Sequence, residues 1–279
     1  MMTMNRRRAI ASLGLFGGSA LLSGCAGQAA GEPGDAASLP TFPGAPAVPQ
    51  PPATAATDSP PEWKYLKLDP ESVAEVAYEM YADGGCMYAI VGSVIRALAE
   101  KVGAPFNSFP ITMMRYGNGG LGGWGSVCGI VNGCAALIGL FQNEKEAKRR
   151  EELITDICVW YEQTPLPIYQ PAEPAWAEDV APSVADSLLC HVAVSNWCKV
   201  TGCETTCDER RERCRRASVD GVIRVVDLLN RNSVDPNCEC LNLTSDTRAC
   251  LECHGPRELS DSMGRMNCAS CHSFDGRHP

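Results

Sequence analysis

From residue 62 onwards, apolar residues recur at helical spacing, and no sustained apolar–polar alternation predicts a strand. The sequence Asp69-Pro70-Glu71 is typical of a helix start, with a capping aspartate, a proline in the first turn and an acidic residue after it. We therefore predict a mainly α-helical fold. The expected helices cover residues 70–83, 86–101, 126–141, 143–162, 183–199 and 204–230, with Gly221 as a candidate break in the last one.

Three segments interrupt the helical pattern. Residues 117–125 contain six glycines and predict an irregular loop. Residues 164–182 are rich in proline and predict an extended segment. Residues 233–279 hold six cysteines and few large aliphatic side chains. This last segment is expected to be irregular, with little hydrophobic core of its own.

The N-terminus is typical of an export signal. Arginines at positions 6–8 precede an apolar run over residues 9–22, which is shorter than the ~20 residues that span a bilayer. The run ends in Leu22-Ser23-Gly24-Cys25, which resembles a bacterial lipobox. We predict a signal peptide over residues 1–24 and lipidation at Cys25. The alternative is an ordinary signal peptide with an incidental cysteine. The paired arginines also resemble a twin-arginine export signal in part.

The segment that follows is rich in alanine, proline, glycine, serine and threonine. Residues 25–61 cannot bury enough apolar surface to fold, so we interpret them as a disordered tether. The tether leads to a helical, cysteine-rich domain over residues 62–232 and a C-terminal segment over residues 233–279. This organisation predicts a periplasmic protein held at a membrane by its lipid.

Two copies of a haem attachment motif lie near the C-terminus. They read Cys250-Leu251-Glu252-Cys253-His254 and Cys268-Ala269-Ser270-Cys271-His272. In this motif the two thiols add to the haem vinyl groups, and the adjacent histidine ligates the iron. We predict two covalently bound haems c, with His254 and His272 as proximal ligands. A zinc site made of the same four thiols would not explain why a histidine follows each pair.

Each haem iron needs a second axial ligand. The chain has only four histidines, so His191 and His278 remain as distal candidates. Met263 and Met266, between the two motifs, are rival ligands that would raise the reduction potential. We expect histidine at both haems.

The formal net charge is −9, and loss of the signal peptide would make it more negative. Nucleic-acid binding is not expected, because affinity for nucleic acid rests on lysine and arginine neutralising phosphates. An acidic surface instead favours basic redox partner proteins.

A second group of cysteines lies upstream of the haem motifs. Cys190 and Cys198, eight residues apart, are expected on one side of a helix, and Cys203, Cys207 and Cys214 on another stripe. Facing stripes of thiols would suit an iron–sulfur cluster. Disulfides and buried unreactive thiols are the alternatives. The upstream thiols are Cys86, Cys128, Cys134, Cys158, Cys190, Cys198, Cys203, Cys207 and Cys214.

The glycine-rich stretch 119–133, with Cys128-Gly129 inside it, resembles the Cys-Gly-Ala-x-x-Gly signature of a family of redox-active proteins. Gly84-Gly85-Cys86 fits that family's first cysteine, and Cys190 and Cys198 fit its remaining pair. With two haem motifs after it, the chain is similar over residues 65–279 to the split-Soret cytochromes c.

The resemblance implies a helical domain with a [2Fe–2S] cluster, two bis-histidine haems and a homodimer with closely packed haems. The implied cluster ligands are Cys86, Cys128, Cys190 and Cys198. The sequence departs from the family in having Ile130 where alanine is expected, and in its extra thiols. Cys134 or Cys214 is therefore an alternative ligand.

We interpret the protein as an electron carrier rather than an enzyme, because saturated haem irons leave no site for a substrate. The main alternative is a small oxyanion or peroxide reductase with an open haem site. A third is a cysteine-rich structural lipoprotein without haem. The sequence holds no Ser-His-Asp set, and the glycine-rich run lacks the lysine and hydroxyl residue of a phosphate-binding loop.

Overall fold

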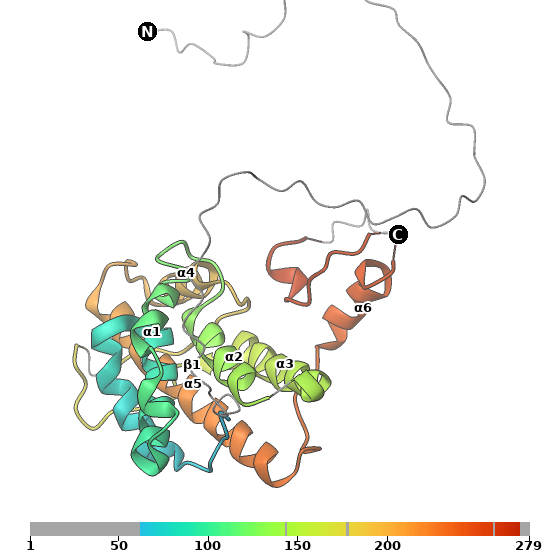
Figure 1. The fold of residues 1–279 in the computed structure, drawn as a ribbon. Coiled ribbons are helices and arrows are strands. Elements are labelled where there is room, and N and C mark those ends of the chain that lie inside the picture. Colours follow the sequence, from blue (N-terminus) through green and yellow to red (C-terminus); the bar gives the residue numbers. More distant parts are fainter. Residues whose placement is uncertain (1–61, 143, 177–178, 259, 274–279) are drawn as a thin grey trace, which may run out of the picture. The chain divides into compact units, whose positions relative to one another are not determined.

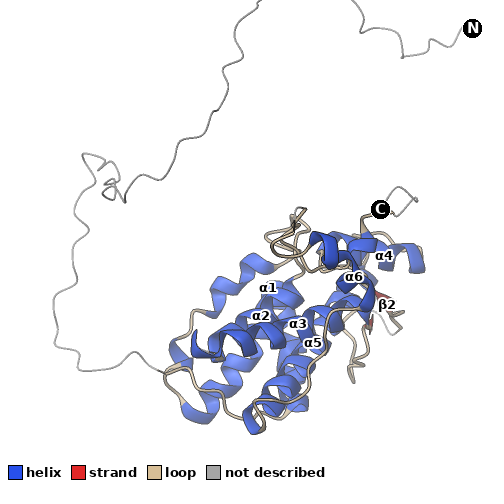
Figure 2. Cartoon of the chain, turned by 90° about the vertical axis from the view of Figure 1, so that its right-hand side faces the viewer, coloured by secondary structure: helices blue, strands red, loops and turns tan. Residues whose placement is uncertain are grey.

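The computed structural model describes residues 62–142, 144–176, 179–258 and 260–273. Within these residues the chain is mainly helical, as predicted (Figure 2). The α-helices are α1 (Pro70–Val102), α2 (Gly129–Phe141), α3 (Ala147–Gln163), α4 (Cys190–Thr201), α5 (Asp208–Val234) and α6 (Ser245–His254). The 3-10 helices are η1 (Phe106–Ser108), η2 (Ile111–Gly117), η3 (Glu144–Glu146) and η4 (Cys268–Ser270). The strands are β1 (Pro165–Leu166) and β2 (Ser183–Val184), which pair antiparallel.

Helix α1 joins the first two predicted helices into one element with a kink. Asp69 caps its start by accepting a hydrogen bond from the Ser72 N–H at 3.4 Å, and Pro70 occupies the first turn, as expected. The kink lies at Gly85, whose φ of 77° and ψ of −166° are non-helical. The predicted break at Gly84-Gly85 is therefore a change of direction between two helical halves.

The core of the domain lies where α1 packs against α5 and α2 (Figure 1). Gly221 does not break α5. A Cβ at this position would come within 2.7 Å of Ile130 and 3.2 Å of Ile90, so the glycine lets α5 approach both neighbouring helices. The prediction that Gly221 breaks the helix is therefore wrong, and the glycine instead permits a close contact between helices.

Helix α5 carries buried charge into this interface. Arg216 and Glu212 form an ion pair at 2.7 Å with both side chains buried, and Glu212 also accepts the Tyr78 hydroxyl at 2.7 Å. The Tyr78–Glu212 hydrogen bond ties α1 to α5, while the second carboxylate oxygen of Glu212, Oε2, is buried without a partner among the described residues.

The predicted helix over residues 183–199 begins later than expected, at Cys190. Ser183 and Val184 instead pair with β1, and Leu189 forms an isolated bridge with Val127. In the proline-rich stretch before them, the described residues form no helix, and Pro165–Leu166 is the strand β1. Asp220 on α5 holds this stretch by accepting the N–H groups of Ile168 and Tyr169, each at 2.9 Å.

Helix α5 also begins later than predicted, at Asp208 with Cys207 as its cap. Cys203 therefore lies in the loop before the helix, and the expected stripe of Cys203, Cys207 and Cys214 does not form. The cause is Gly202, which ends α4 in a left-handed conformation (φ 74°) and turns the chain.

The C-terminal segment lies along α3. The Leu241 N–H donates to Asp156 at 2.8 Å, and the Asn267 N–H donates to Glu162 at 3.0 Å. Among the described residues after 234, only Thr247 and Gly255 are buried. This agrees with the expected lack of a core in the segment. The expectation that the segment is irregular is corrected in part, because α6 and η4 lie within it.

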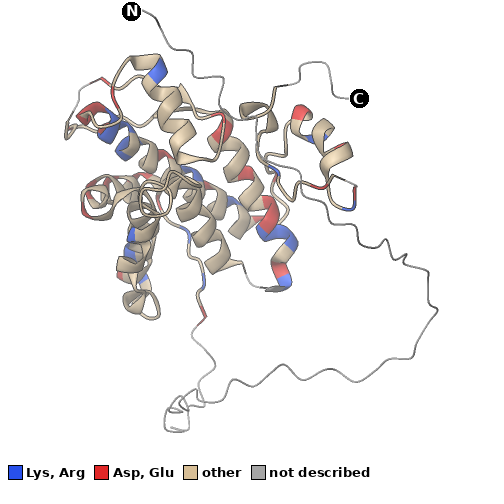
Figure 3. Ribbon diagram, turned by 90° about the horizontal axis from the view of Figure 1, so that it is seen from above, with Lys and Arg blue, Asp and Glu red and all other residues tan. Residues whose placement is uncertain are grey.

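The predicted signal peptide, Cys25, the tether and His278 lie outside the described residues. Among the helices that are described, none combines the length and the apolar character needed to cross a bilayer. Acidic and basic residues are interspersed along the same helices (Figure 3).

Candidate functional site

A short antiparallel bridge sets the glycine-rich loop against the start of α4. The Cys128 N–H donates to the Leu188 carbonyl at 2.8 Å, and the Cys190 N–H donates to the Ser126 carbonyl at 2.7 Å. Cys128 ends the loop just before α2, whereas Cys190 is the first residue of α4. The bridge thus brings together two cysteines that are far apart in the sequence.

Cys86 reaches the same place from α1. It follows the kink at Gly85, and its Sγ lies 3.8 Å from the Gly117 carbonyl oxygen. Gly129 allows this approach, because a Cβ there would overlap Cys86 Sγ and Gly117 O. The Cys128-Gly129 pair of the motif therefore supplies one thiol and makes room for another.

The three thiols are coupled electrostatically, with Cys128 at the centre. Hydrogen bonds from Cys190 and then Cys86 hold the pKa of the Cys128 thiol well below its usual value. The same hydrogen bonds, followed by burial, raise the pKa of both Cys86 and Cys190. The arrangement favours a thiolate at Cys128 with two thiols directed at it.

Cys214 on α5 is the next thiol at this site. After the larger effects of Cys128 and burial, its charge also raises the pKa of Cys86 and Cys190. Burial and then the charge of Cys203 raise the pKa of Cys198, the fourth ligand implied by the family resemblance. The structure thus places Cys198 near both Cys203 and Cys214.

Cys134, the other alternative ligand, lies in the helical core. Its fully buried thiol donates to the Gly221 carbonyl at 3.4 Å, and burial raises its pKa. It therefore behaves as a small packed side chain. None of the described cysteines forms a disulfide.

Arg213 brings a buried cation to the thiols. Its Nη1 lies 3.9 Å from Cys214 Sγ. Burial acts to lower the pKa of Arg213, but the neighbouring Cys214, Tyr161 and Cys128 raise it on balance. The Nε and Nη2 donors of Arg213 are buried without a hydrogen-bond partner in the part of the chain that the structure describes.

Buried donors without a partner are costly, so a group that accepts hydrogen bonds is expected next to Arg213. Thiolate ligands and the sulfides of an iron–sulfur cluster carry negative charge and accept hydrogen bonds. Four thiols with a buried cation beside them are suitable ligands for such a cluster. They belong to Cys86, Cys128, Cys190 and Cys214, and the cation is Arg213.

The two haem motifs lie side by side (Figure 1). The first occupies the last turns of α6, and the second follows Asn267 through η4. Burial and then a hydrogen bond with Cys250 raise the pKa of Cys268, so the first thiols of the two motifs are in contact. Cys253 and Cys271 are exposed, which leaves them accessible for attachment to haem.

Two of the candidate iron ligands have an oriented ring. His254 Nδ1 lies 3.0 Å from the Ser260 carbonyl oxygen, and His191 Nδ1 lies 2.9 Å from the Gly125 carbonyl oxygen. Histidines that bind metal commonly donate the other ring N–H in this way, which fixes the ring. His191 is exposed at the first turn of α4, one residue after Cys190.

The rival methionine ligands lie beside α3. Met263 and Met266 line a surface hollow of about 340 Å³ together with Ile154, Cys158 and Leu188. Met263 itself is 94% exposed. The hollow is also lined by Glu151, Glu162 and Arg265, so it is only partly apolar.

Comparison with known proteins agrees with this site. The family described as "Putative redox-active protein (C_GCAxxG_C_C)" matches residues 89–229. Split-Soret cytochrome c from Desulfovibrio desulfuricans (strain ATCC 27774) is 34% identical over 220 residues, which cover 76% of this chain and 77% of that protein. The chain belongs to the split-Soret cytochrome c family.

A solved structure of a split-Soret cytochrome c supports the same assignment. The protein, from D. desulfuricans ATCC 27774 and reported with a novel iron centre, matches with a TM-score of 0.71 and 33% identity. The match covers 78% of this chain and 95% of that one. As a split-Soret cytochrome c homologue, the chain is a metal-binding redox protein that transfers electrons.

Two residues near the thiols of this split-Soret cytochrome c homologue, Arg213 and Tyr161, were not predicted from the sequence. Arg213 stands in the run Glu212-Arg213-Cys214-Arg215-Arg216, which reads as an ordinary charged helix face. Tyr161 is one of two aromatic residues on α3, next to Trp160. The adjacency of Arg213 to Cys214 was the one available signal, but only the packing of α5 shows that this face is buried.

Proposed function

We propose that the protein is an exported electron carrier with two covalently bound haems c and a [2Fe–2S] cluster. The observation that carries the proposal is the convergence of the Cys86, Cys128 and Cys190 thiols from three separate elements. No observation favours the alternative of a haem reductase with an open site.

For the cluster, the proposed ligands are Cys86, Cys128, Cys190 and Cys214. Cys214 replaces Cys198 in this set because its charge acts on both Cys86 and Cys190. Arg213 supports the same choice, since its Nη1 lies 3.9 Å from Cys214 Sγ and two of its other donors are buried without a partner among the described residues.

For the haems, the proposed attachment residues are Cys250, Cys253, Cys268 and Cys271, with His254 and His272 as proximal ligands. His191 and His278 remain the proposed distal ligands. The Gly125 carbonyl supports His191 in this role, because it holds Nδ1 and so orients the ring for a bond through Nε2.

When bound, the haems and the cluster supply one-electron oxidation and reduction. The protein's own groups set the conditions for that chemistry. Arg213 offsets the negative charge of the thiolates, and the burial of Cys86 and Cys128 keeps water away. The exposed cysteines of the two haem motifs, Cys253 and Cys271, leave a surface at which a redox partner protein can dock.

Export, anchoring and assembly complete the proposal. The lipobox at Cys25 supports lipid anchoring in the periplasm, and the paired arginines support the twin-arginine route. The family resemblance supports a homodimer. A tether of residues 25–61 would let the carrier reach redox partners near the membrane.

The cluster is tested by measuring iron, acid-labile sulfide and pyridine haemochrome in the purified mature protein. We expect iron in excess of haem, together with sulfide. In Cys214→Ser this excess iron and sulfide should be lost, because a cluster ligand is removed. The matched control is Cys134→Ser, since that thiol is also buried but lies in the core. In the control, iron and sulfide should be retained.

If sulfide is lost in Cys198→Ser but not in Cys214→Ser, the fourth cluster ligand is Cys198 and not Cys214. Iron equal to the haem content, with no sulfide, would contradict the cluster and leave only the dihaem carrier.

A further inference from the structure

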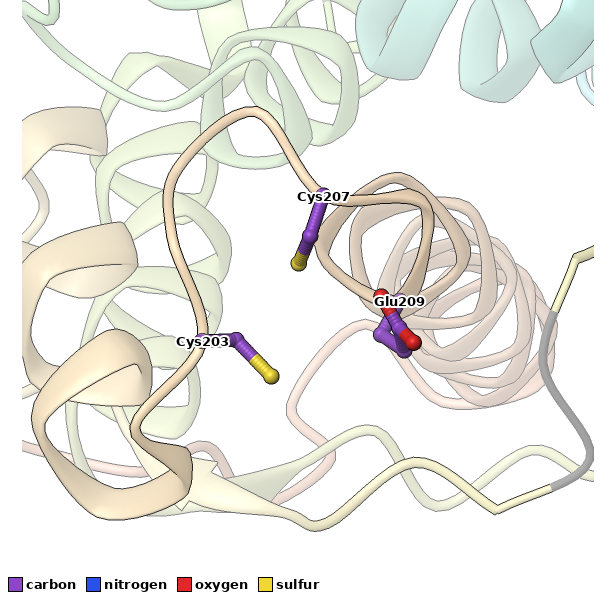
Figure 4. A group of neighbouring side chains, drawn as sticks. All are labelled: Cys203, Cys207 and Glu209. Carbon is purple, nitrogen blue, oxygen red and sulfur yellow. The ribbon is translucent and has the colours of Figure 1, made fainter.

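A second group of metal-binding side chains lies outside the proposed cluster and the haem motifs. Cys203, Cys207 and Glu209 converge in the loop between α4 and α5 (Figure 4). Their sulfur and carboxylate ligand atoms all lie within 4.8 Å of one another. Three groups that each bind metal in their anionic form repel one another at this distance unless protons or a cation lie between them.

Local hydrogen bonds hold the loop and the Cys207 thiol in place. The Cys207 N–H donates to the Glu204 carbonyl at 3.3 Å, which closes the loop. Arg210 donates from its backbone N–H to Cys207 Sγ at 3.3 Å and from its Nε to the Thr205 carbonyl at 2.6 Å. Glu209 then follows in the first turn of α5, so the helix start presents its carboxylate to the thiols.

We propose that Cys203, Cys207 and Glu209 bind a zinc ion. Two thiolates and one carboxylate belong to the ligand types that zinc takes, and three protein ligands leave one tetrahedral position for water. A harder ion such as magnesium would not select thiolates. The site is separate from the haem motifs and does not depend on the proposed function.

The position of the loop indicates what the zinc ion would do. The loop joins α4, which begins with Cys190, to α5, which carries Arg213 and Cys214. Since both ends of the loop lead to residues at the proposed cluster, zinc at this site would hold the two helices in fixed relation. The role is therefore one of positioning, with no redox step at the zinc.

The test uses the full mature holoprotein, reduced, stripped of weakly bound metal with a chelator and then titrated with zinc alone. We expect one zinc per chain. X-ray absorption at the zinc edge should show two sulfur ligands at about 2.3 Å and oxygen ligands at about 2.0–2.2 Å. Cys207→Ser should weaken zinc binding by at least about tenfold, and Glu209→Gln should weaken it less, because the second variant keeps both thiols.

Two matched variants serve as controls. Glu204→Gln changes an exposed carboxylate in the same loop, and Cys158→Ser removes a half-buried thiol on α3. Both should bind zinc as the parent does. Alkylation followed by mass spectrometry gives a second measurement, in which zinc should protect Cys203 and Cys207 but not Cys158.

Three outcomes would overturn the proposal. One is the absence of zinc binding by the reduced protein. Another is zinc binding that Cys207→Ser leaves unchanged. The third is a pair of findings: a disulfide joins Cys203 and Cys207 in the mature protein, and zinc does not protect the two thiols from alkylation after the disulfide is reduced.

Discussion

Arg213 is the residue whose surroundings say most about the site. Its side chain is buried, and two of its donors have no partner among the described residues. In most buried positions such an arginine would destabilise the fold. Here it lies beside Cys214. Burial acts to lower the pKa of Arg213, but the charges of Cys214, Tyr161 and Cys128 raise it on balance. An anionic group bound by the thiols would satisfy this cation.

We therefore predict that Arg213→Met lowers the reduction potential of the cluster, because the reduced form carries more negative charge. Loss of a hydrogen bond to a charged group, about 1.5–3 kcal/mol, corresponds to about 65–130 mV for one electron. A redox titration followed by electron paramagnetic resonance measures this potential. Arg211→Met removes an exposed arginine two residues away and should leave the potential unchanged. Equal potentials in Arg213→Met and the parent would exclude this role for Arg213.

Among the elements, α1 shows how one backbone angle places a thiol. Gly85 has φ 77° and ψ −166°, in a region that only glycine adopts readily. A Cβ at Gly85 would also overlap the Asn118 amide. The kink turns the helix just before Cys86, so that its thiol meets Cys128. An unbroken helix through Gly85 would direct Cys86 elsewhere.

We predict that Gly85→Ala lowers the free energy of unfolding by about 1–3 kcal/mol through backbone strain alone. It should also reduce the sulfide content, since Cys86 directly follows the strained residue. Denaturant unfolding and sulfide analysis measure the two effects. The control is Gly139→Ala on α2, where an added Cβ meets nothing within 4 Å. This control should be neutral or slightly stabilising. If both variants unfold alike, the kink does not depend on glycine.

At the scale of the whole molecule, the helical domain and the C-terminal segment differ in how much apolar surface they bury. The helical domain has a continuous buried core from α1, α2, α3 and α5. The C-terminal segment has only Thr247 and Gly255 buried after residue 234 within its described residues. A segment with so little apolar burial does not offset the entropy of ordering its chain.

The C-terminal segment should therefore depend on haem attachment for its order. In a variant with Cys250, Cys253, Cys268 and Cys271 all changed to alanine, we expect amides in residues 241–273 to exchange rapidly with deuterated solvent. Amides in α1 and α5 should keep their protection. Hydrogen exchange with mass spectrometry compares the two regions, and Cys158→Ala controls for the loss of a thiol alone. Equal protection of the C-terminal segment in the variant and the parent would show that it folds without haem.

Local patterns in the sequence were enough for the helical class, the start of α1 and the irregular glycine-rich loop. They gave the wrong secondary structure or the wrong role where a residue far away in the sequence makes the decisive contact. Residues 183–189 have a helical pattern, but Ser183 pairs with β1 and Leu189 pairs with Val127. Gly221 looks like a helix breaker in isolation, yet it makes room for Ile130 and Ile90. Neither contact is visible in the periodicity of a single segment.

The sequence by itself determined that this protein carries haem attachment motifs and a Cys-Gly motif, because both are patterns of adjacent residues. Only the tertiary structure decided which thiols meet. The convergence of Cys86, Cys128 and Cys190 depends on a kink and a β-bridge. Cys214 and Arg213 join them through the burial of α5. Such proximity arises from packing between elements far apart in the chain, and spacing along the sequence does not encode it.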